Sequence, residues 1–204
     1  MLIKSYIEEI NKRIKDQRVL DIGCCASTSK NLLKRHRLYE QSAKEIIGID
    51  YNKELIKEAN DKLGYKIYYC DLTNTEDVKG IIKKFGCFKN IICTDVIEHV
   101  SNLGLFLENI KLMLEDNGSL YLTTPNMRSP RWMQMCITNT YKVNADHICW
   151  FDIFTLNNLL KRADLKIVET LYQAQEMKAI RFFNFKPQDW MARRILAVVQ
   201  KENV

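Results

Sequence analysis

Residues 19–28 read Val-Leu-Asp-Ile-Gly-Cys-Cys-Ala-Ser-Thr. The apolar, β-branched start of this stretch is typical of a buried strand, and Gly23 marks the turn into a loop that a ligand can approach closely. A dinucleotide-binding fingerprint would place glycine again at positions 25 and 28, where Cys25 and Thr28 stand instead. The Gly-Lys-Ser/Thr sequence of a phosphate-binding P-loop does not occur here either. The stretch therefore favours neither NAD nor ATP as the ligand.

Short apolar runs alternate with helix-period segments along the rest of the chain. We expect strands at residues 18–23, 45–50, 66–71, 90–95, 119–124, 165–172 and 195–200. We expect helices at residues 29–40, 52–63, 76–85, 103–114 and 151–163. Strands separated by amphipathic helices indicate an α/β fold with a mostly parallel sheet and helices on both faces. The last two strands have no clean helical crossover between them, which favours an antiparallel pair at the sheet edge.

Composition indicates one globular domain over residues 1–204. The chain is 47% hydrophobic and 27% charged, as in ordinary soluble domains with a sizeable core. Residues 1–16 are charged and helix-periodic, so they predict an N-terminal helix and not a secretory signal. Seven cysteines without a CxxC pair indicate reduced thiols and a cytoplasmic protein. The net charge of +6 permits a phosphorylated or nucleic-acid partner without requiring one.

Aspartates follow four of the first five predicted strands. In a parallel sheet, ligands bind at the carboxyl ends of the strands, so Asp21, Asp50, Asp71 and Asp95 are expected at one edge. Any one of them has an alternative interpretation as a helix cap or turn residue. Together they favour a ligand site, in which Asp50 takes both hydroxyls of a ribose and Asp71 accepts from an adenine amino group. The pattern predicts a nucleoside ligand without a pyrophosphate.

The strand ends and the sequence around them resemble those of the class I S-adenosylmethionine-dependent methyltransferases, including methyltransferase types 11 and 23. The matching stretches lie within residues 17–172 and are, in order, VLDIGCCAS, IIGID, YYCDLT, NIICTDVIEHV, GSLYLTTPN and DHICWFDIFTLNNLLKRADLKIVE. The resemblance implies a Rossmann-like sheet of seven strands in the order 3-2-1-4-5-7-6, with the last strand antiparallel. It also implies S-adenosylmethionine as cofactor and S-adenosylhomocysteine as the product formed from it. The implied cofactor-binding residues are Asp21, Gly23, Cys24, Cys25, Asp50, Tyr51, Asp71, Leu72, Thr94 and Asp95.

The resemblance assigns a part of the cofactor to each strand end. The assignments are Asp21 and Gly23 around the methionine, Asp50 on the ribose, Asp71 and Leu72 at the adenine, and Thr94 and Asp95 near the sulfonium and amino groups. The family usually has glycine where this chain has Cys25, and often where it has Ser27. If the loop needs a positive φ there, the strain would be on the order of 1–3 kcal/mol. A cofactor-binding but inactive module is therefore one alternative.

The stretch Asp95-Val96-Ile97-Glu98-His99 follows the fourth strand and is expected to begin a helix. Positions i, i+3 and i+4 of a helix share one face, so Asp95, Glu98 and His99 can converge, and His147 is expected to return to the same edge. These four residues are the possible ligands of a divalent metal. The pattern is similar to two metal-assisted subfamilies, the ubiquinone-biosynthesis O-methyltransferases and the small-RNA terminal 2′-O-methyltransferases. The first acid is usually Glu in both.

Without a metal, His147, His99 and Glu98 are the catalytic candidates, and one of the two histidines is the expected general base. The alternative interpretation is structural: Glu98 favours the start of a helix through the helix dipole, while His99 packs on the sheet. The third histidine, His36, lies in the basic run KRHR and is expected in solvent.

Two segments, residues 125–150 and 173–194, are expected to shape the acceptor pocket. The first is rich in Met, Trp and Tyr and carries Arg128 and Arg131 as possible anion anchors. The second mixes aromatic and basic residues, so 178–194 is a candidate lid, membrane-surface contact or nucleic-acid platform. Packing of its apolar face on the core is the alternative.

The sequence thus predicts a methyltransferase, acting at oxygen on a small-molecule or lipid-linked, glycolipid-type acceptor. An RNA 2′-O-methyltransferase is the main alternative. The DxxEH…H pattern and the positive charge favour that alternative, whereas no separate RNA-binding domain is recognisable in the sequence.

Overall fold

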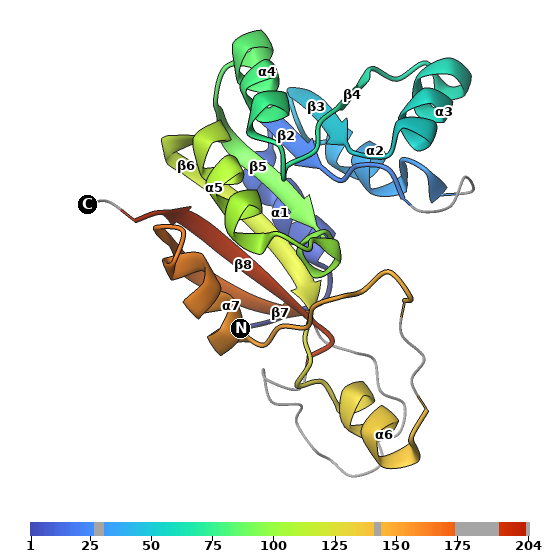
Figure 1. Ribbon diagram of the computed structural model, residues 1–204, viewed down its shortest axis with the longest axis vertical. Coiled ribbons are helices and arrows are strands. Elements are labelled where there is room, and N and C mark those ends of the chain that lie inside the picture. The colour runs from blue at the N-terminus through green and yellow to red at the C-terminus, as the bar shows by residue number, and fades with distance from the viewer. Residues whose placement is uncertain (27–30, 141–143, 174–191, 203–204) are drawn as a thin grey trace.

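A computed structural model describes residues 1–26, 31–140, 144–173 and 192–202, and its strands form one sheet (Figure 1). Within these residues the sheet has 8 strands, in the order β1-β7-β8-β6-β5-β2-β3-β4. The strands are β1 (Leu2–Ile3), β2 (Arg18–Ile22), β3 (Glu45–Asp50), β4 (Ile67–Tyr69), β5 (Phe88–Thr94), β6 (Leu114–Pro125), β7 (Leu165–Gln173) and β8 (Arg194–Lys201). The helices are α1 (Tyr6–Ile14), α2 (Lys34–Glu40), α3 (Lys53–Leu63), α4 (Thr75–Phe85), α5 (Leu103–Met113), α6 (Pro130–Thr138) and α7 (Ile153–Lys161).

The strand order confirms the predicted sheet, with one addition. The strands β2 to β8 follow the expected order, and β8 runs antiparallel to both β6 and β7 while the other pairs are parallel. The prediction of seven strands is wrong by one, because Leu2 and Ile3 pair with Tyr172 and Gln173 as a short outer strand. The hydroxyl of Ser5 accepts the N–H of Glu8 and caps α1, so the predicted helix over 1–16 begins only at Tyr6.

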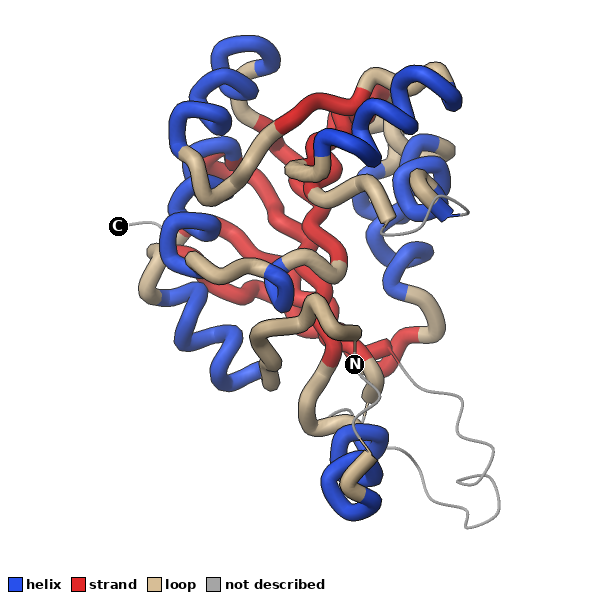
Figure 2. The backbone as a smooth tube through the Cα atoms, turned by 45° about the vertical axis from the view of Figure 1, so that its right-hand side comes forward, coloured by secondary structure: helices blue, strands red, loops and turns tan. Residues whose placement is uncertain are grey.

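Two layers of helices cover the sheet (Figures 1 and 2). On one face, α4, α5 and α7 pack on a cluster that includes Ile91 and Cys93 of β5. On the other face, α1 and α2 pack on a cluster that includes Ile92. The side chains of a strand alternate between the two faces, so an unbroken apolar run such as residues 91–93 is buried on both.

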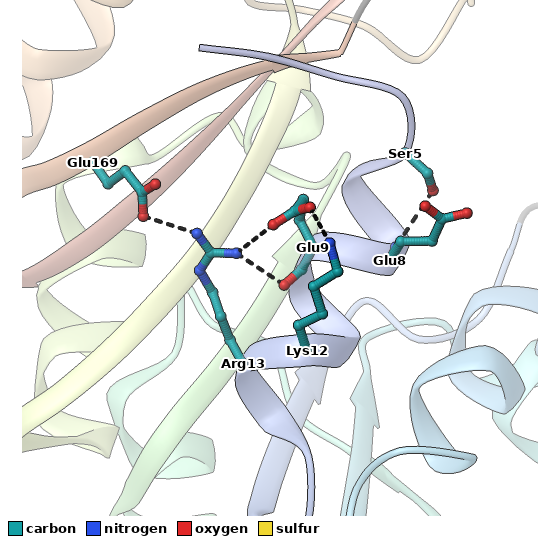
Figure 3. A network of polar contacts seen from close by, with 6 residues as sticks. All are labelled: Ser5, Glu8, Glu9, Lys12, Arg13 and Glu169. Carbon is teal, nitrogen blue, oxygen red and sulfur yellow. Dashed lines mark hydrogen bonds and ion pairs between the residues drawn. The ribbon is translucent and has the colours of Figure 1, made fainter.

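A polar network ties α1 to the outer strands (Figure 3). Arg13 donates from Nη1 to a carboxylate oxygen of Glu9 at 2.9 Å and from Nη2 to a carboxylate oxygen of Glu169 in β7, also at 2.9 Å. Lys12 pairs with Glu9 at 2.7 Å. These pairs are partly exposed and individually weak, about 0–1 kcal/mol each. They orient the helix, while Tyr6, Ile10 and Ile14 supply the buried contact.

The carboxyl ends of β2, β3, β5 and β6 meet at one edge of the sheet, and α6 lies beyond that edge (Figures 1 and 2). Pro130 occupies the first turn of α6, where its missing N–H costs no hydrogen bond. This helix lies inside the predicted acceptor segment 125–150. Most of the second acceptor segment, residues 174–191, lies outside the described residues. Of the suggested membrane or nucleic-acid contact through 178–194, residues 178–191 fall there as well.

The prediction that a helix begins at Asp95 is wrong. Residues Ile97–His99 form one 3-10 turn, and α5 starts only at Leu103, where the side chain of Asn102 accepts the N–H of Leu105. Within the described residues, no helix has the length and apolar character that crossing a bilayer would require.

Candidate active site

One cavity of about 980 Å³ lies at this edge of the sheet. Its walls include residues from the ends of β2, β3, β5 and β6, from α6 and from the loop before α7. The predicted cofactor-binding and catalytic residues that line it are Gly23, Cys25, Asp50, Tyr51, Asp95, Glu98, His99 and His147. Nucleoside-sized ligands bind in pockets of this volume range. Predicted cofactor residues and predicted catalytic residues therefore face one space.

Gly23 is the position where the glycine-poor loop needs glycine. Its φ is +66°, and a Cβ there would lie 2.5 Å from Cγ2 of Val96. Cys25, by contrast, does not have a positive φ. The substitution of the usual glycine by cysteine therefore causes no left-handed backbone strain at this position. The second departure from the family, Ser27, lies outside the described residues. The loop through Cys25 thus keeps its path with a single glycine.

Asp50 is held at the base of the cavity by backbone donors. Its Oδ2 accepts the N–H of Cys25 at 3.0 Å, and its Oδ1 accepts the N–H of Asn52 at 2.9 Å. Burial raises the pKa of Asp50, and these backbone hydrogen bonds oppose that effect. Each carboxylate oxygen can accept a further bond, so the side chain is aimed and still able to hold two ribose hydroxyls. Tyr51 beside it is 70% exposed.

His36 is buried, and its predicted place in solvent is wrong. The side chain is 2% exposed, and Nδ1 lies 2.8 Å from Oδ2 of Asp21. The run KRHR is helical in α2, so its four side chains point in different directions and one meets the sheet. Asp21 and Cys24 are likewise buried and are not among the residues that line the cavity. The buried side chains of Asp21 and Cys24 therefore support the loop after β2 and do not face the cavity.

Three of the residues predicted to contact the adenine or the sulfonium group of the cofactor lie outside the cavity wall. Asp71 accepts the N–H and the hydroxyl of Thr73 at 2.8 and 2.7 Å. Leu72 and Thr94 are buried. None of these three is among the residues that line the cavity. Their contacts with a cofactor stay predictions.

Asp95 lines the cavity with its carboxylate already engaged. Arg194 donates from Nε to Oδ1 at 2.9 Å and from Nη2 to Oδ2 at 2.7 Å. Arg35 donates to Oδ2 at 3.1 Å, and the hydroxyl of Thr123 donates to Oδ1 at 3.1 Å. A carboxylate accepts about four hydrogen bonds, so little capacity is left for a metal. The sequence gave no local sign of these partners, because they come from α2, β6 and β8.

Glu98, His99 and His147 form a compact cluster. One possible ligand atom from each lies within 4.8 Å of the others, and the two imidazole rings meet edge to face at 4.7 Å. The carbonyl of Glu98 accepts the N–H groups of Ile148 and Cys149, which brings the loop of His147 onto the 3-10 turn. His99 Nδ1 lies 3.0 Å from the carbonyl oxygen of Asp146, so this nitrogen is the donor. Asp95 is not part of the cluster.

The cluster contains two polar atoms without a hydrogen-bond partner. They are Oε1 of Glu98, whose side chain is 1% exposed, and Nδ1 of His147. The other carboxylate oxygen of Glu98 accepts the hydroxyl of Thr124 at 3.2 Å. Burial, and then the charge of Asp95, raise the pKa of Glu98 to about 7. Burial and the neighbouring His99 lower the pKa of His147, so its imidazole is neutral at neutral pH. Both groups can accept a proton there.

Comparison with curated proteins finds ubiquinone biosynthesis O-methyltransferases. The mitochondrial protein of Rattus norvegicus is 28% identical over 134 residues, which cover 62% of this chain and 36% of the relative. The protein of Coxiella burnetii is 23% identical over 143 residues, covering 68% of this chain and 56% of the relative. The chain therefore spans only about a third to a half of the length of these relatives.

Comparison with solved structures finds the same fold. A SAM-dependent methyltransferase from Archaeoglobus fulgidus superposes with a TM-score of 0.62 at 19% identity, over 97% of this chain and 95% of that one. Magnesium protoporphyrin IX methyltransferase from Synechocystis, solved with bound SAH, gives 0.60 at 14% identity, over 96% and 82%. The methyltransferase domain family itself matches residues 2–170. This chain thus belongs to the methyltransferase domain family, and its fold is that of the S-adenosylmethionine-dependent methyltransferases.

Proposed function

We propose that the protein methylates a hydroxyl oxygen of a small-molecule or lipid-linked acceptor. The observation that carries the proposal is the pair of unpartnered buried atoms, Glu98 Oε1 and His147 Nδ1, in the cavity that Asp50 also lines. Buried polar atoms normally have partners, and these two have none among the described residues. A hydroxyl group of an acceptor would supply a donor to either. The rat and Coxiella relatives are both named as O-methyltransferases, which supports the choice of oxygen.

Each residue of the cavity has a proposed role that follows from its position. Asp50, aimed by backbone N–H groups, is suited to two ribose hydroxyls, and Gly23 lets the loop approach the cofactor. S-adenosylmethionine, when bound, supplies the methyl group. Glu98 or His147 takes the single proton that an acceptor hydroxyl loses, a role worth about 10²–10⁴ in rate. His99, fixed by the carbonyl of Asp146, holds the His147 ring in place.

Titration calorimetry with S-adenosylhomocysteine tests the cofactor site. The native chain should bind, and Asp50→Ala should weaken binding by roughly 2–3 kcal/mol, because a charged bidentate contact is lost. Glu54→Gln, a neighbouring acid that also lines the cavity, is the matched control and should change little. Undiminished binding by Asp50→Ala would sink the assignment of the ribose site.

Acceptor choice and metal dependence need activity assays. Offering a catechol, a sugar nucleotide and a short RNA 3′ end compares the acceptor classes, and transfer to RNA alone would overturn the proposal. The cluster of Glu98, His99 and His147 has a donor set that suits a divalent cation. Activity that is indifferent to a chelator assigns these residues to proton transfer. Loss on chelation, restored by one divalent ion, assigns them to a metal instead.

A further inference from the structure

Two adjacent cysteines, Cys24 and Cys25, begin the loop after β2, and no step of the proposed methyl transfer uses either thiol. Their sulfur atoms and a carboxylate oxygen of Asp50 all lie within 4.8 Å of one another. Neighbouring side chains of an extended strand point to opposite faces, so adjacency in sequence does not by itself bring two thiols together. Here the chain has just turned through the positive φ of Gly23, and both thiols lie beside the end of β3.

Hydrogen bonds from the backbone hold this group in place. The N–H of Cys24 donates to the carbonyl oxygen of Ile49 at 3.4 Å. The N–H of Cys25 donates to Oδ2 of Asp50 at 3.0 Å. Gly48 leaves the space that the first thiol occupies, because a Cβ on Gly48 would lie 2.9 Å from Sγ of Cys24. The three side chains are therefore preorganised, which lowers the entropic cost of binding a ligand between them.

Two thiols and a carboxylate form a donor set for a thiophilic divalent ion. Thiolates select ions such as Zn²⁺ and Cd²⁺ over Mg²⁺ and Ca²⁺, which prefer oxygen ligands. Binding replaces the protons of the two thiols, and these protons pass to the solvent. Three protein ligands leave one position of a tetrahedral ion open. Cys25 and Asp50 line the cavity and Cys24 is buried behind them, so the open position faces the cavity.

The other cysteines have no comparable surroundings. All seven cysteines lie within the described residues. Among those residues, the only other group of three with the spacing of metal ligands is Glu98, His99 and His147, which contains no sulfur. Cys136 on α6 is exposed and belongs to neither group. A strong signal from thiolate ligation therefore reports the adjacent pair.

We propose that Cys24, Cys25 and Asp50 bind a thiophilic divalent ion such as Zn²⁺, and that the bound ion excludes S-adenosylmethionine from the cavity. Each carboxylate oxygen of Asp50 already accepts one backbone N–H and has room for one further partner. An ion on either oxygen leaves too little capacity for two ribose hydroxyls. The ion is thus an inhibitor, and its removal frees the cofactor site. Ion binding goes beyond the proposed function, whereas the exclusion of the cofactor rests on the proposed ribose contact.

Titration of the reduced native chain with Cd²⁺ tests the ion site directly. Thiolate ligation gives an ultraviolet charge-transfer band that nitrogen and oxygen ligands do not give, and a single ion per chain should saturate it. Cys25→Ser and Cys24→Ser should each weaken Cd²⁺ binding by about 100-fold, because each removes one thiolate. Cys136→Ser, which removes an exposed thiol outside the group, is the matched control and should keep the native affinity. Excess Zn²⁺ should abolish the band by displacing Cd²⁺.

Calorimetry with S-adenosylhomocysteine tests the exclusion of the cofactor. Cd²⁺ at ten times its own Kd should weaken binding to the native chain about 10-fold, and a chelator should restore it. The same Cd²⁺ concentration should leave the affinity of Cys25→Ser for S-adenosylhomocysteine at its metal-free value, whatever that value is.

The outcomes separate the two parts of the inference. No thiolate band in the native chain, or a band that Cys25→Ser keeps at native affinity, would overturn the ion site. A band with unchanged affinity for S-adenosylhomocysteine, or an equal effect of Cd²⁺ on Cys25→Ser, would overturn the exclusion alone. Failure of the metal-free native chain to bind S-adenosylhomocysteine would overturn the proposed cofactor site and the exclusion with it, while the band would still decide the ion site.

Discussion

Asp95 and Glu98 are two carboxylates on one turn of chain after β5, and their surroundings are opposite. Asp95 accepts from two arginines and a threonine, whereas the carboxylate of Glu98 accepts the hydroxyl of Thr124 on one oxygen and leaves Oε1 without a partner among the described residues. Asp95 has an unusual backbone, with φ at 54° in the left-handed region. The first carboxylate is saturated by the protein, while the second is left for a ligand or a proton.

The contrast assigns different roles to two residues of one short stretch: Asp95 supports neighbouring side chains, and Glu98 is free to exchange a proton. Charge-assisted hydrogen bonds lock the Asp95 side chain, and that rigidity places the arginines at the cavity wall. A buried carboxylate without a cationic partner favours its protonated form, which is why the pKa of Glu98 is raised to about 7. A group whose pKa lies near the working pH can both take up and release a proton.

The largest expected effect is on turnover by Glu98→Gln. The amide has the same shape and cannot accept the proton, so kcat should fall by about 10²–10³, roughly 3–4 kcal/mol on the barrier. Initial rates with the acceptor class that proves active in the comparison proposed above measure it, and affinity for S-adenosylhomocysteine should stay unchanged. Glu108→Gln, an exposed acid on α5, is the control. If Glu98→Gln keeps full activity while His147→Asn loses it, His147 alone takes the proton.

The pH dependence of stability sharpens the difference between the two acids. The pKa of Glu98 is about 7 in the folded chain against an ordinary value of 4.5. The folded state therefore binds more protons between these pH values, and Glu98 loses stabilising effect as pH rises through that window. Urea unfolding should show the native chain losing on the order of 3 kcal/mol relative to Glu98→Gln between pH 4 and pH 8. Parallel stability curves for the two proteins would contradict the raised pKa.

Asp95→Asn should unfold the chain more easily by about 2–3 kcal/mol, because two arginines lose a charged partner and stay half-buried. Chemical denaturation measures the change. Asp164→Asn serves as control, since it also removes an ion pair, with Lys111, but one in which the acid is 66% exposed. That control should change stability by less than about 1 kcal/mol. Equal losses of stability in the two variants would contradict the supporting role of Asp95, because its carboxylate would then contribute no more than an exposed surface carboxylate.

The smallest expected difference separates Gly23→Ala from Gly64→Ala. Both glycines have a positive φ, +66° and +71°, so both substitutions carry a left-handed penalty of about 1–2 kcal/mol. A Cβ at Gly64 meets nothing within 4 Å, whereas one at Gly23 meets Val96, which lies between the two acids. Gly23→Ala should therefore lose about 1–2 kcal/mol more in thermal or urea unfolding.

The added mutation Val96→Ala should recover part of that extra loss, because it removes the methyl group that the new Cβ would strike. No recovery would mean that the backbone conformation, and not the contact with Val96, sets the cost at Gly23.

Much of the fold was readable from the sequence because its signals are local. The strand runs matched the observed strands within a few residues, as in residues 45–50 and Glu45–Asp50. Local signals also placed Asp50 and His147 near one cavity, since parallel strands end at the same edge. The helix expected at Asp95 failed because the backbone there turns through a positive φ, which sequence periodicity does not reveal.

The sequence by itself determined the alternation of strands and helices, the single glycine of the loop after β2 and the acids at the strand ends. These features depend on residues close together in the chain, where backbone sterics and side-chain periodicity act. Only the tertiary structure decided which charges meet. Asp95 pairs with Arg35 and Arg194 across 60 and 99 residues, and His36 turns inward to Asp21. Such pairings arise because folding buries charged groups that must then find partners, whatever their distance in sequence.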